Sequence, residues 1–245
     1  ETFDVYKSKS IIEKNQNALF GSDTETTPAA LLGTSFSAQD NFSFPAYLQA
    51  YSNLDIANFA IPGGGMFTSI ISYLSSPYFQ ENKPPLIIWE TQSVYSFNKG
   101  TETSFRQIIP AINGTCEGDN LIEKSTQSIT ESKSYTLFDN LSDRKIYGIN
   151  YYIHIDVDNI GFNNFIIEFE YDDEDGEWFP IDRTDRFNNK GQFYVELSDK
   201  IDSNLLRIEL NNTQNSQAKV TAKLCKINKP LIEQTTIIQK KENKS

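Results

Sequence analysis

Histidine is nearly absent from this chain, which carries a single one, His154, in 245 residues. Basic residues are also few, since 22 Lys and Arg stand against 33 Asp and Glu for a net charge of −11. No Lys- or Arg-rich block offers the electrostatic footprint that nucleic acid or an anionic membrane surface requires, which argues against both partners. No apolar run approaches the roughly 20 residues of a membrane span.

Aromatic residues are plentiful, with 17 Phe and 12 Tyr. A disordered chain carries few aromatics, so the composition indicates a folded protein. The length leaves room for one large domain or two modest ones, each able to bury a core.

The first half is organised around an apolar run, residues 29–32, that stops abruptly at Gly33-Thr34-Ser35. Such a run predicts a strand, and a serine directly after it would present its hydroxyl at the carboxyl edge of a sheet, where α/β folds bind ligands. We expect Gly33 to supply backbone dihedrals that other residues adopt only with strain. The alternative is that Ser35 belongs to an ordinary turn.

Helical and strand-like patterns alternate after Ser35. A helical pattern over residues 44–51 is followed by a short strand pattern over 54–60, the glycine run 63–65, a second helical pattern over 70–74 and an apolar run over 85–90. This alternation predicts a parallel sheet built from right-handed crossovers.

The second half changes character. Residues 113–133 are polar without a period and predict a linker or an irregular entry to a second domain. Alternating patterns then predict strands without intervening helices, which indicates an antiparallel β-sandwich. The predicted strands cover residues 134–138, 145–157, 165–171, 192–197, 205–210 and 218–227. The segment 231–245 is expected to be a polar tail.

Several motifs of the first half, in this order, resemble a known family. They are Gly33-Thr34-Ser35-Phe36-Ser37, the Asn58-Phe59-Ala60 strand leading into Gly63-Gly64-Gly65, and Trp89-Glu90 with Tyr95 shortly after. The chain resembles the periplasmic alginate O-acetyltransferases of the SGNH-like group, in which an α/β domain precedes a β-sandwich carbohydrate-binding module. It resembles their C-terminal portion, so the start at Glu1 is expected to be a truncated end.

The resemblance implies that Ser35 is a nucleophile that accepts an acetyl group and passes it to a sugar hydroxyl. Serine needs a base and a group that orients the base. In the resembled family an Asp-x-His motif upstream of this stretch supplies both, so this chain alone is expected to be nearly inactive. His154 is an alternative base, although its alternating surroundings place it on a strand of the second domain.

The tetrahedral intermediate needs hydrogen-bond donors for its oxyanion. We expect these from the Ser35 N–H and from Gly63, Gly64 and Gly65, although the glycine run can also be read as a flexible connection. Tyr95 stands where the resembled family has an active-site tyrosine and would contact substrate or the oxyanion; a packing role is the alternative. Trp89 and Glu90 receive no catalytic role, because an acidic residue at a strand end can simply cap a helix.

The two cysteines are expected to form a disulfide, because the resembled family has a pair at corresponding places. Cys116 stands near the entry to the predicted sandwich and Cys225 in its last strand. Such a bond persists in an oxidising compartment such as the periplasm, and the alternative is two free thiols in a cytosolic protein.

A sugar-binding surface combines aromatic faces with polar groups. Residues 177–186 offer Trp178 with Arg183 and Arg186, which are able to hold carboxylates but also to pair with Asp182 and Asp185. An acidic protein opposes a polyanion such as alginate unless positive groups gather locally. The acidic run 172–177 is read as a solvated turn, so neither a metal nor a cofactor is predicted.

These observations predict a partial SGNH-like α/β region over 1–112 and a β-sandwich carbohydrate-binding module over 113–230. The predicted function is polysaccharide O-acetylation in the periplasm, with an alginate-like polymer, an acetyl donor, the absent N-terminal segment and other exopolysaccharide biosynthesis proteins as partners. The alternatives are a carbohydrate acetylesterase of the same group and a non-catalytic carbohydrate-binding or scaffold fragment.

Overall fold

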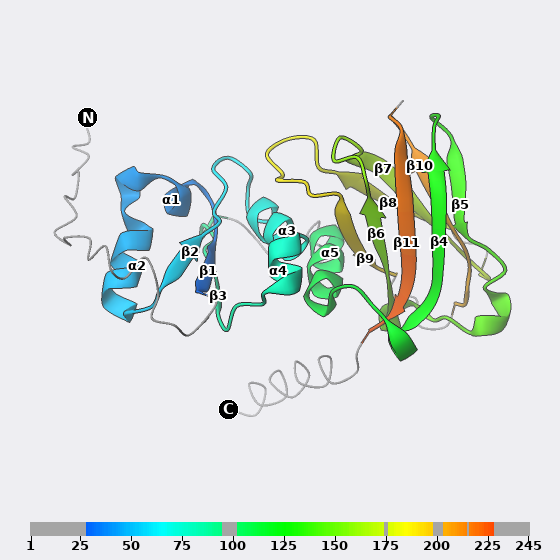
Figure 1. Cartoon of the computed structure of the whole chain (residues 1–245), viewed down its shortest axis with the longest axis horizontal. Coiled ribbons are helices and arrows are strands. Elements are labelled where there is room, and N and C mark those ends of the chain that lie inside the picture. The colour runs from blue at the N-terminus through cyan, green and yellow to red at the C-terminus, as the bar shows by residue number, and fades with distance from the viewer. Residues whose placement is uncertain (1–27, 95–101, 174–175, 198–202, 215, 228–245) are drawn as a thin grey trace. The chain divides into compact units, whose positions relative to one another are not determined.

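The computed structural model describes residues 28–94, 102–173, 176–197, 203–214 and 216–227. These residues form two compact units (Figure 1). The first contains residues up to 98 together with 185–188, and the second contains the remainder. Helix α5 therefore groups with the second unit, whereas the sequence prediction drew the boundary after residue 112.

A three-stranded parallel sheet forms the centre of the first unit. Its strand order is β2-β1-β3, and β1 pairs in parallel with both neighbours. The strands are β1 (Ala29–Leu32), β2 (Ile56–Asn58) and β3 (Ile87–Trp89), and the helices are α1 (Ser35–Ala38), α2 (Phe44–Ser52), α3 (Thr68–Leu74) and α4 (Pro77–Glu81). The predicted α/β region is confirmed.

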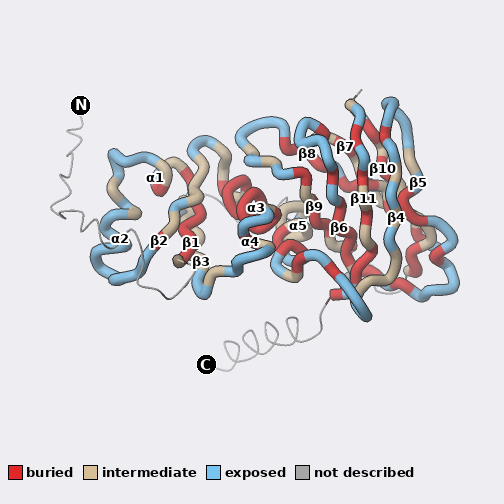
Figure 2. Tube along the Cα trace, in the orientation of Figure 1, coloured by how far each residue is buried: buried red, intermediate tan, exposed pale blue. Residues whose placement is uncertain are grey.

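Burial within the first unit is uneven (Figure 2). β1 and α3 are buried along their whole length, whereas no residue of α2 is buried. A central strand of a parallel sheet is apolar on both faces, and the continuous run Ala29–Leu32 has that character. The same run that identified β1 in the sequence thus fixes it at the middle of the sheet.

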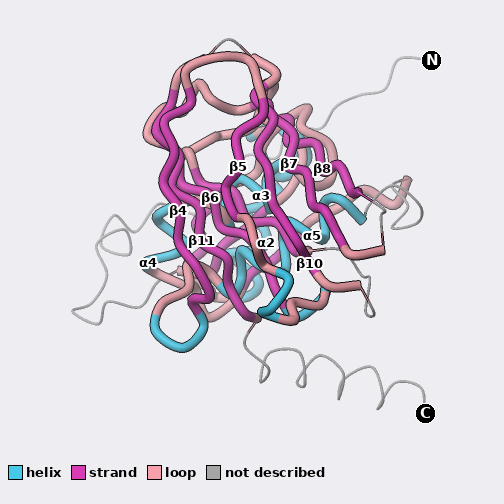
Figure 3. Tube along the Cα trace, turned by 90° about the vertical axis from the view of Figure 1, so that its right-hand side faces the viewer, coloured by secondary structure: helices cyan, strands magenta, loops and turns pink. Residues whose placement is uncertain are grey.

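Two antiparallel sheets of four strands each form a sandwich in the second unit, and Figure 3 shows them as two layers. Their orders are β4-β11-β6-β9 and β5-β10-β7-β8. The strands are β4 (Leu121–Ile129), β5 (Ser134–Phe138), β6 (Tyr151–Val157), β7 (Asn164–Tyr171), β8 (Gly176–Asp182), β9 (Gln192–Glu196), β10 (Leu205–Asn212) and β11 (Ala218–Lys226), with helix α5 (Glu102–Asn113) preceding them. The sandwich prediction is confirmed.

Two of these strands differ from the sequence prediction. β4 lies within residues 113–133, which were read as linker, and β8 lies in a segment read as a turn and a polar loop. Both are edge strands of their sheets. Edge strands have one unpaired side, so they carry polar residues, and β8 also carries Pro180, which a central strand does not tolerate.

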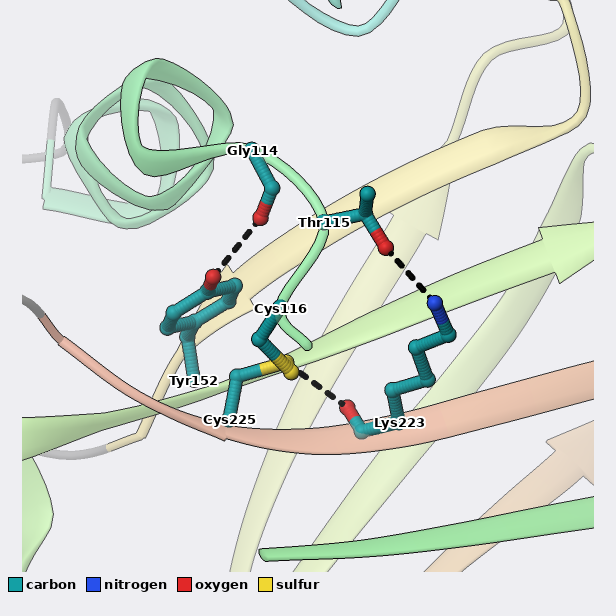
Figure 4. Close-up of a disulfide and its surroundings, with 6 residues drawn as sticks. All are labelled: Gly114, Thr115, Cys116, Tyr152, Lys223 and Cys225. Carbon is teal, nitrogen blue, oxygen red and sulfur yellow. Dashed lines mark hydrogen bonds between the residues drawn. A yellow bond between two sulfur atoms is a disulfide. The ribbon is translucent and has the colours of Figure 1, made fainter. Parts of the chain in front are cut away.

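Cys116 and Cys225 form the predicted disulfide (Figure 4), with their Cα atoms 5.7 Å apart. It joins the segment that follows α5 to the last strand, β11. Beside it the Tyr152 hydroxyl donates to the Gly114 carbonyl oxygen at 2.7 Å, and the Lys223 ammonium donates to the Thr115 hydroxyl at 2.9 Å. Three contacts thus hold the end of α5 against the sheet.

Among the described residues, no helix combines the length and the apolar character needed to cross a membrane.

Candidate active site

Ser35 is the first residue of α1, immediately beyond the carboxyl end of β1. Thr34 caps this short helix, its hydroxyl accepting from the Phe36 N–H at 3.5 Å. The Ser35 side chain is half-buried, and within the described residues no hydrogen bond of its hydroxyl or its N–H is found. Both groups are therefore available to a bound molecule, the hydroxyl as a nucleophile and the N–H as an oxyanion donor.

Glu90 holds the turn that carries Ser35. Its carboxylate accepts from the Thr34 N–H at 2.8 Å, from the Thr34 hydroxyl at 3.0 Å and from the Ser37 hydroxyl at 3.1 Å. We call Glu90, Thr34 and Ser37 the Glu90 clamp. Charge-assisted hydrogen bonds of this kind are stronger than neutral ones, so the residues on both sides of Ser35 are fixed.

Gly33 is required by close packing. A Cβ at this position would lie 2.6 Å from Glu90 Oε2 and 2.9 Å from Ser37 Oγ. Gly33 is not among the residues with a positive φ, so the expected dihedral reason is wrong. Its N–H donates to the Ser69 hydroxyl at 3.0 Å and its carbonyl oxygen accepts from the Ile61 N–H at 3.0 Å. The turn is thus braced by α3 and by the chain that follows β2.

Gly63, Gly64 and Gly65 lie two to four residues beyond Ile61, which is hydrogen-bonded to Gly33. Gly63 and Gly65 have φ values of 73° and 72°, a region that favours glycine. A Cβ on Gly64 would lie 2.8 Å from the Thr68 Cβ, and the Thr68 hydroxyl donates to the Gly64 carbonyl oxygen. The loop is therefore built around glycine and anchored to the start of α3, which argues against a merely flexible connection.

The predicted carbohydrate-binding residues differ in burial and in the unit to which they belong. Arg183 is only 3% exposed; its guanidinium donates to the Gln192 carbonyl oxygen at 2.7 Å and to Gln107 Oε1 at 3.2 Å, and lies 4.5 Å from the Phe193 ring centroid. Burial lowers its pKa to about 9. A sugar carboxylate in solvent does not reach such a group, so this assignment is wrong.

Arg186 belongs to the first unit. Its guanidinium donates to the Pro62 carbonyl oxygen at 2.9 Å, and a Cβ on Gly63 would lie 2.9 Å from the same nitrogen. Arg186 is therefore a neighbour of the glycine loop, whereas Trp178 belongs to the second unit, where it is 72% exposed. Tyr95 lies outside the described residues.

His154 is buried in the second unit at 5% exposure and stacks on the Tyr194 ring at 4.4 Å. Neither ring nitrogen has a hydrogen-bond partner within the described residues. Burial, with a smaller contribution from the Lys223 charge, lowers its pKa to about 3. The imidazole is thus neutral and packed in the core. The structure favours this packing role over the alternative that His154 is the base for Ser35.

Sequence reasoning left Glu90 without a role and assigned none to Thr34 and Ser37, although both belong to the motif that carries Ser35. Thr34 and Ser37 follow β1, and Glu90 follows its neighbour β3. The carboxyl ends of parallel strands meet at one edge of a sheet. That rule would have brought Glu90 to the Ser35 turn. Among the described residues no cluster of metal-ligating side chains is found.

The described residues thus combine a parallel sheet, which has a clamped serine at the carboxyl end of its central strand, with an antiparallel β-sandwich, and they define a protein with an α/β part and an all-β part. Residues 2–93 match the family described as "SGNH hydrolase-like domain, acetyltransferase AlgX". The chain is thus similar to this family over residues 2–93.

Individual proteins of alginate biosynthesis are also similar to this chain. The chain is 30% identical over 222 residues to the alginate biosynthesis protein AlgX of Pseudomonas syringae pv. tomato, covering 88% of this chain and 46% of that protein. It is 42% identical over 82 residues to the probable alginate O-acetylase AlgJ of Pseudomonas fluorescens, covering 34% of this chain and 20% of that one.

The solved structure of Pseudomonas aeruginosa AlgX superposes with a TM-score of 0.72 at 23% identity, over 82% of this chain and 50% of that chain. This likeness shows that the two share a fold. The chain spans about half the length of the curated AlgX relatives that match most of it.

Proposed function

We propose that this chain carries the nucleophile of a polysaccharide O-acetyltransferase. Ser35 accepts an acetyl group from a donor and passes it to a hydroxyl group of an alginate-like exopolysaccharide. The observation that carries the proposal is the Ser35 turn, whose hydroxyl and N–H have no hydrogen-bond partner among the described residues while the Glu90 clamp fixes the residues around them.

The chemistry follows from these groups. The Ser35 oxygen attacks the acetyl carbonyl carbon, its proton leaves to a base, and the carbonyl oxygen becomes an oxyanion within reach of the Ser35 N–H. The glycine loop supplies further N–H groups, and removal of one such donor typically costs about 2.7–4 kcal/mol of transition-state stabilisation. Collapse of the tetrahedral intermediate breaks the bond to the donor's leaving group, which takes the proton back from the base and leaves Ser35 acetylated. A sugar hydroxyl then gives its proton to the base and attacks the acetyl carbonyl carbon, and the bond to Ser35 breaks as Ser35 recovers a proton from the base.

We assign the base and its orienting carboxylate to an Asp-His pair in a segment outside this chain. The support is the burial of the only histidine, His154, within the second unit. A serine hydroxyl without a base is a weak nucleophile, so this chain by itself acylates slowly. Other exopolysaccharide biosynthesis proteins are the proposed partners.

The proposed compartment is the periplasm. The disulfide between Cys116 and Cys225 supports an oxidising environment, because cytosolic thiols are kept reduced. Alginate biosynthesis by the named relatives is consistent with the same placement.

Product analysis tests the transfer step. A form of the protein extended to include the Asp-His segment is incubated with an activated acetyl ester and an oligosaccharide acceptor, and acetylated sugar and free acetate are both quantified. Transfer predicts Ser35-dependent acetylated sugar, absent with Ser35→Ala and retained with Ser52→Ala, an exposed serine of α2. Release of acetate alone, with no acetylated sugar, would contradict a transferase and leave an esterase.

A further inference from the structure

Three side chains outside the glycine loop donate hydrogen bonds to the backbone of the loop and of the residues that flank it. The accepting carbonyl oxygens belong to alternate residues along the chain, namely Pro62, Gly64 and Met66. The donors are, in the same order, the Arg186 guanidinium at 2.9 Å, the Thr68 hydroxyl, and the Trp89 indole N–H at 3.1 Å. We call Arg186, Thr68 and Trp89 the loop anchors.

These bonds set the direction of the loop's N–H groups. A trans peptide unit is planar, so the C=O of one residue and the N–H of the next point to opposite sides. The bond from Arg186 to the Pro62 carbonyl oxygen therefore turns the Gly63 N–H away from the guanidinium. In the same way Thr68 fixes the peptide unit that ends in Gly65. Within the described residues no hydrogen bond of these two glycine N–H groups is found, so both can donate to a bound molecule.

Arg186 and Gly63 fit closely against each other. A Cβ on Gly63 would lie 2.9 Å from the Nη1 atom of Arg186, 3.0 Å from its Cζ and 3.4 Å from its Nε, so the flat guanidinium covers the glycine. Gly63 also has a φ of 73°, which a residue with a side chain adopts only with strain. A larger residue at this position would displace the arginine, so the anchor and the glycine depend on each other.

Arg186 comes from a distant part of the sequence. Residues 185–188 lie in the connection between β8 and β9, yet they group with the first unit. A second hydrogen bond holds this segment there, because the Asn188 N–H donates to the hydroxyl of Ser72, on α3, at 3.3 Å. Since α3 also braces the turn that carries Ser35, the arginine, the glycine loop and the serine belong to one connected set of contacts.

We propose that the loop anchors are positioning residues for acetyl transfer, which hold the N–H groups of Gly63 and Gly65 toward the oxyanion that forms on the acetyl group at Ser35. The inference rests on the proposed function for the reaction and adds the side chains that aim its hydrogen-bond donors. Donors that are already fixed stabilise the transition state without reorganisation, whereas a loose loop has to be ordered during each reaction. The anchors bond to the loop and not to the acetyl group, so each acts through the loop.

Steady-state kinetics with an activated acetyl ester test this inference in the form extended to include the Asp-His segment. Arg186→Ala should lower kcat about 10-fold and change KM by less than about 2-fold, because an oxyanion donor acts in the transition state and its outright removal costs about 10²–10³ in kcat. Thr68→Val and Trp89→Phe remove uncharged donors and should have the same signature, which separates aiming of the loop from the charge of Arg186. Arg144→Ala is the matched control, since Arg144 also donates to a main-chain carbonyl oxygen, that of Ile122.

Methylboronic acid gives a second readout, because its boron accepts the Ser35 oxygen and becomes a tetrahedral anion like the reaction's intermediate. In each anchor variant the loss of affinity for this compound should match the fall in kcat/KM, since both report transition-state stabilisation. Circular dichroism spectra that match the parent confirm that the variants fold. A raised KM at unchanged kcat in Arg186→Ala would show that Arg186 binds substrate, which overturns the inference. So does a kcat that stays at the parent value in all three anchor variants.

Backbone NMR relaxation tests the positioning without the reaction, so the two claims fail separately. The order parameters of Gly63 and Gly65 should be about 0.85 in the parent and fall below about 0.6 in Arg186→Ala, with those of β1 unchanged. Acetylation of Ser35 at the parent rate, with both glycines still rigid in Arg186→Ala, contradicts this inference alone. An extended form that gains no acetyl group on Ser35 contradicts the proposed function, whatever the order parameters.

Discussion

At the scale of residues, the molecule's chemistry depends on the few contacts that surround Ser35. The Glu90 carboxylate accepts from three donors, one backbone N–H and two hydroxyls, on residues that flank the serine on both sides. A nucleophile held this way needs little reorganisation when it reacts, because its turn is already fixed.

Glu90→Ala should therefore slow acylation of Ser35 by an activated ester about 10- to 100-fold, since small displacements of reacting groups cost rates of that order. Ser37→Ala, which removes only one of the clamp's bonds, should have a smaller effect. Stopped-flow measurement of the acylation rate checks this. Equal rates for Glu90→Ala and the parent protein would show that the clamp does not position Ser35.

Gly33→Ala should also damage the site, because its Cβ would lie 2.6 Å from Glu90 Oε2. If that contact is the cause, combining Gly33→Ala with Glu90→Ala should cost less than the sum of the single changes, as expected for residues in contact. A double-mutant cycle on thermal stability measures the coupling. Strict additivity would mean that Gly33 is needed for another reason.

At the scale of elements, apolar strands could be predicted from sequence while polar edges could not. β1 and β3 are predicted by continuous apolar runs, and β7 by the alternation of apolar and polar residues. Both signals are local, so they can be recognised without knowledge of the tertiary structure. β4 and β8 are edge strands whose polar residues and proline resemble linker and loop. The same distinction holds for the candidate site, where Ser35 could be predicted because it belongs to a local motif. The role of Glu90 and the burial of Arg183 depend on which elements become neighbours.

Strand β6 carries a titrating group that the sandwich keeps neutral. The pKa of His154 is lowered to about 3, against about 6.5 in an unfolded chain. Below about pH 6.5 the imidazole is therefore protonated in the unfolded state but not in the folded state. This difference lowers the free energy of unfolding as pH falls, by up to about 1.4 kcal/mol per pH unit.

His154→Phe should remove that dependence while keeping a ring against Tyr194. Glu196 acts in the opposite sense, because burial raises its pKa to about 7, so the difference between the variant and the parent is the quantity to measure. Denaturant unfolding of both proteins from pH 4 to pH 7, a range of about three pH units, measures this difference. The free energy of unfolding of the variant, relative to that of the parent, should rise as pH falls. A constant difference would contradict the assignment.

At the scale of the whole molecule, the two units have different sources of stability. The second contains the disulfide, which closes a loop of 109 residues between Cys116 and Cys225. The first has no cysteine and depends on its sheet and helices. Covalent closure of a long loop constrains the unfolded chain, which typically stabilises a domain by about 2–4 kcal/mol.

Reduction should therefore destabilise the second unit selectively. We expect faster hydrogen exchange in β4, β6 and β11 and in α5, whose following segment the disulfide holds, with β1 and β3 unchanged. Cys116→Ser with Cys225→Ser should reproduce the effect without reductant. Equal acceleration in both units would show that their stabilities are coupled.

Acetylation of Ser35 is the central claim, and intact mass after incubation with an activated acetyl ester tests it most directly. We compare this chain with a form extended to include the Asp-His segment, and each of them with its Ser35→Ala variant. Peptide mapping locates the acetyl group. The account predicts rapid gain of one acetyl group on Ser35 in the extended form and slow gain in this chain. Labelling that persists in both Ser35→Ala variants, or an extended form that gains no acetyl group, would contradict it.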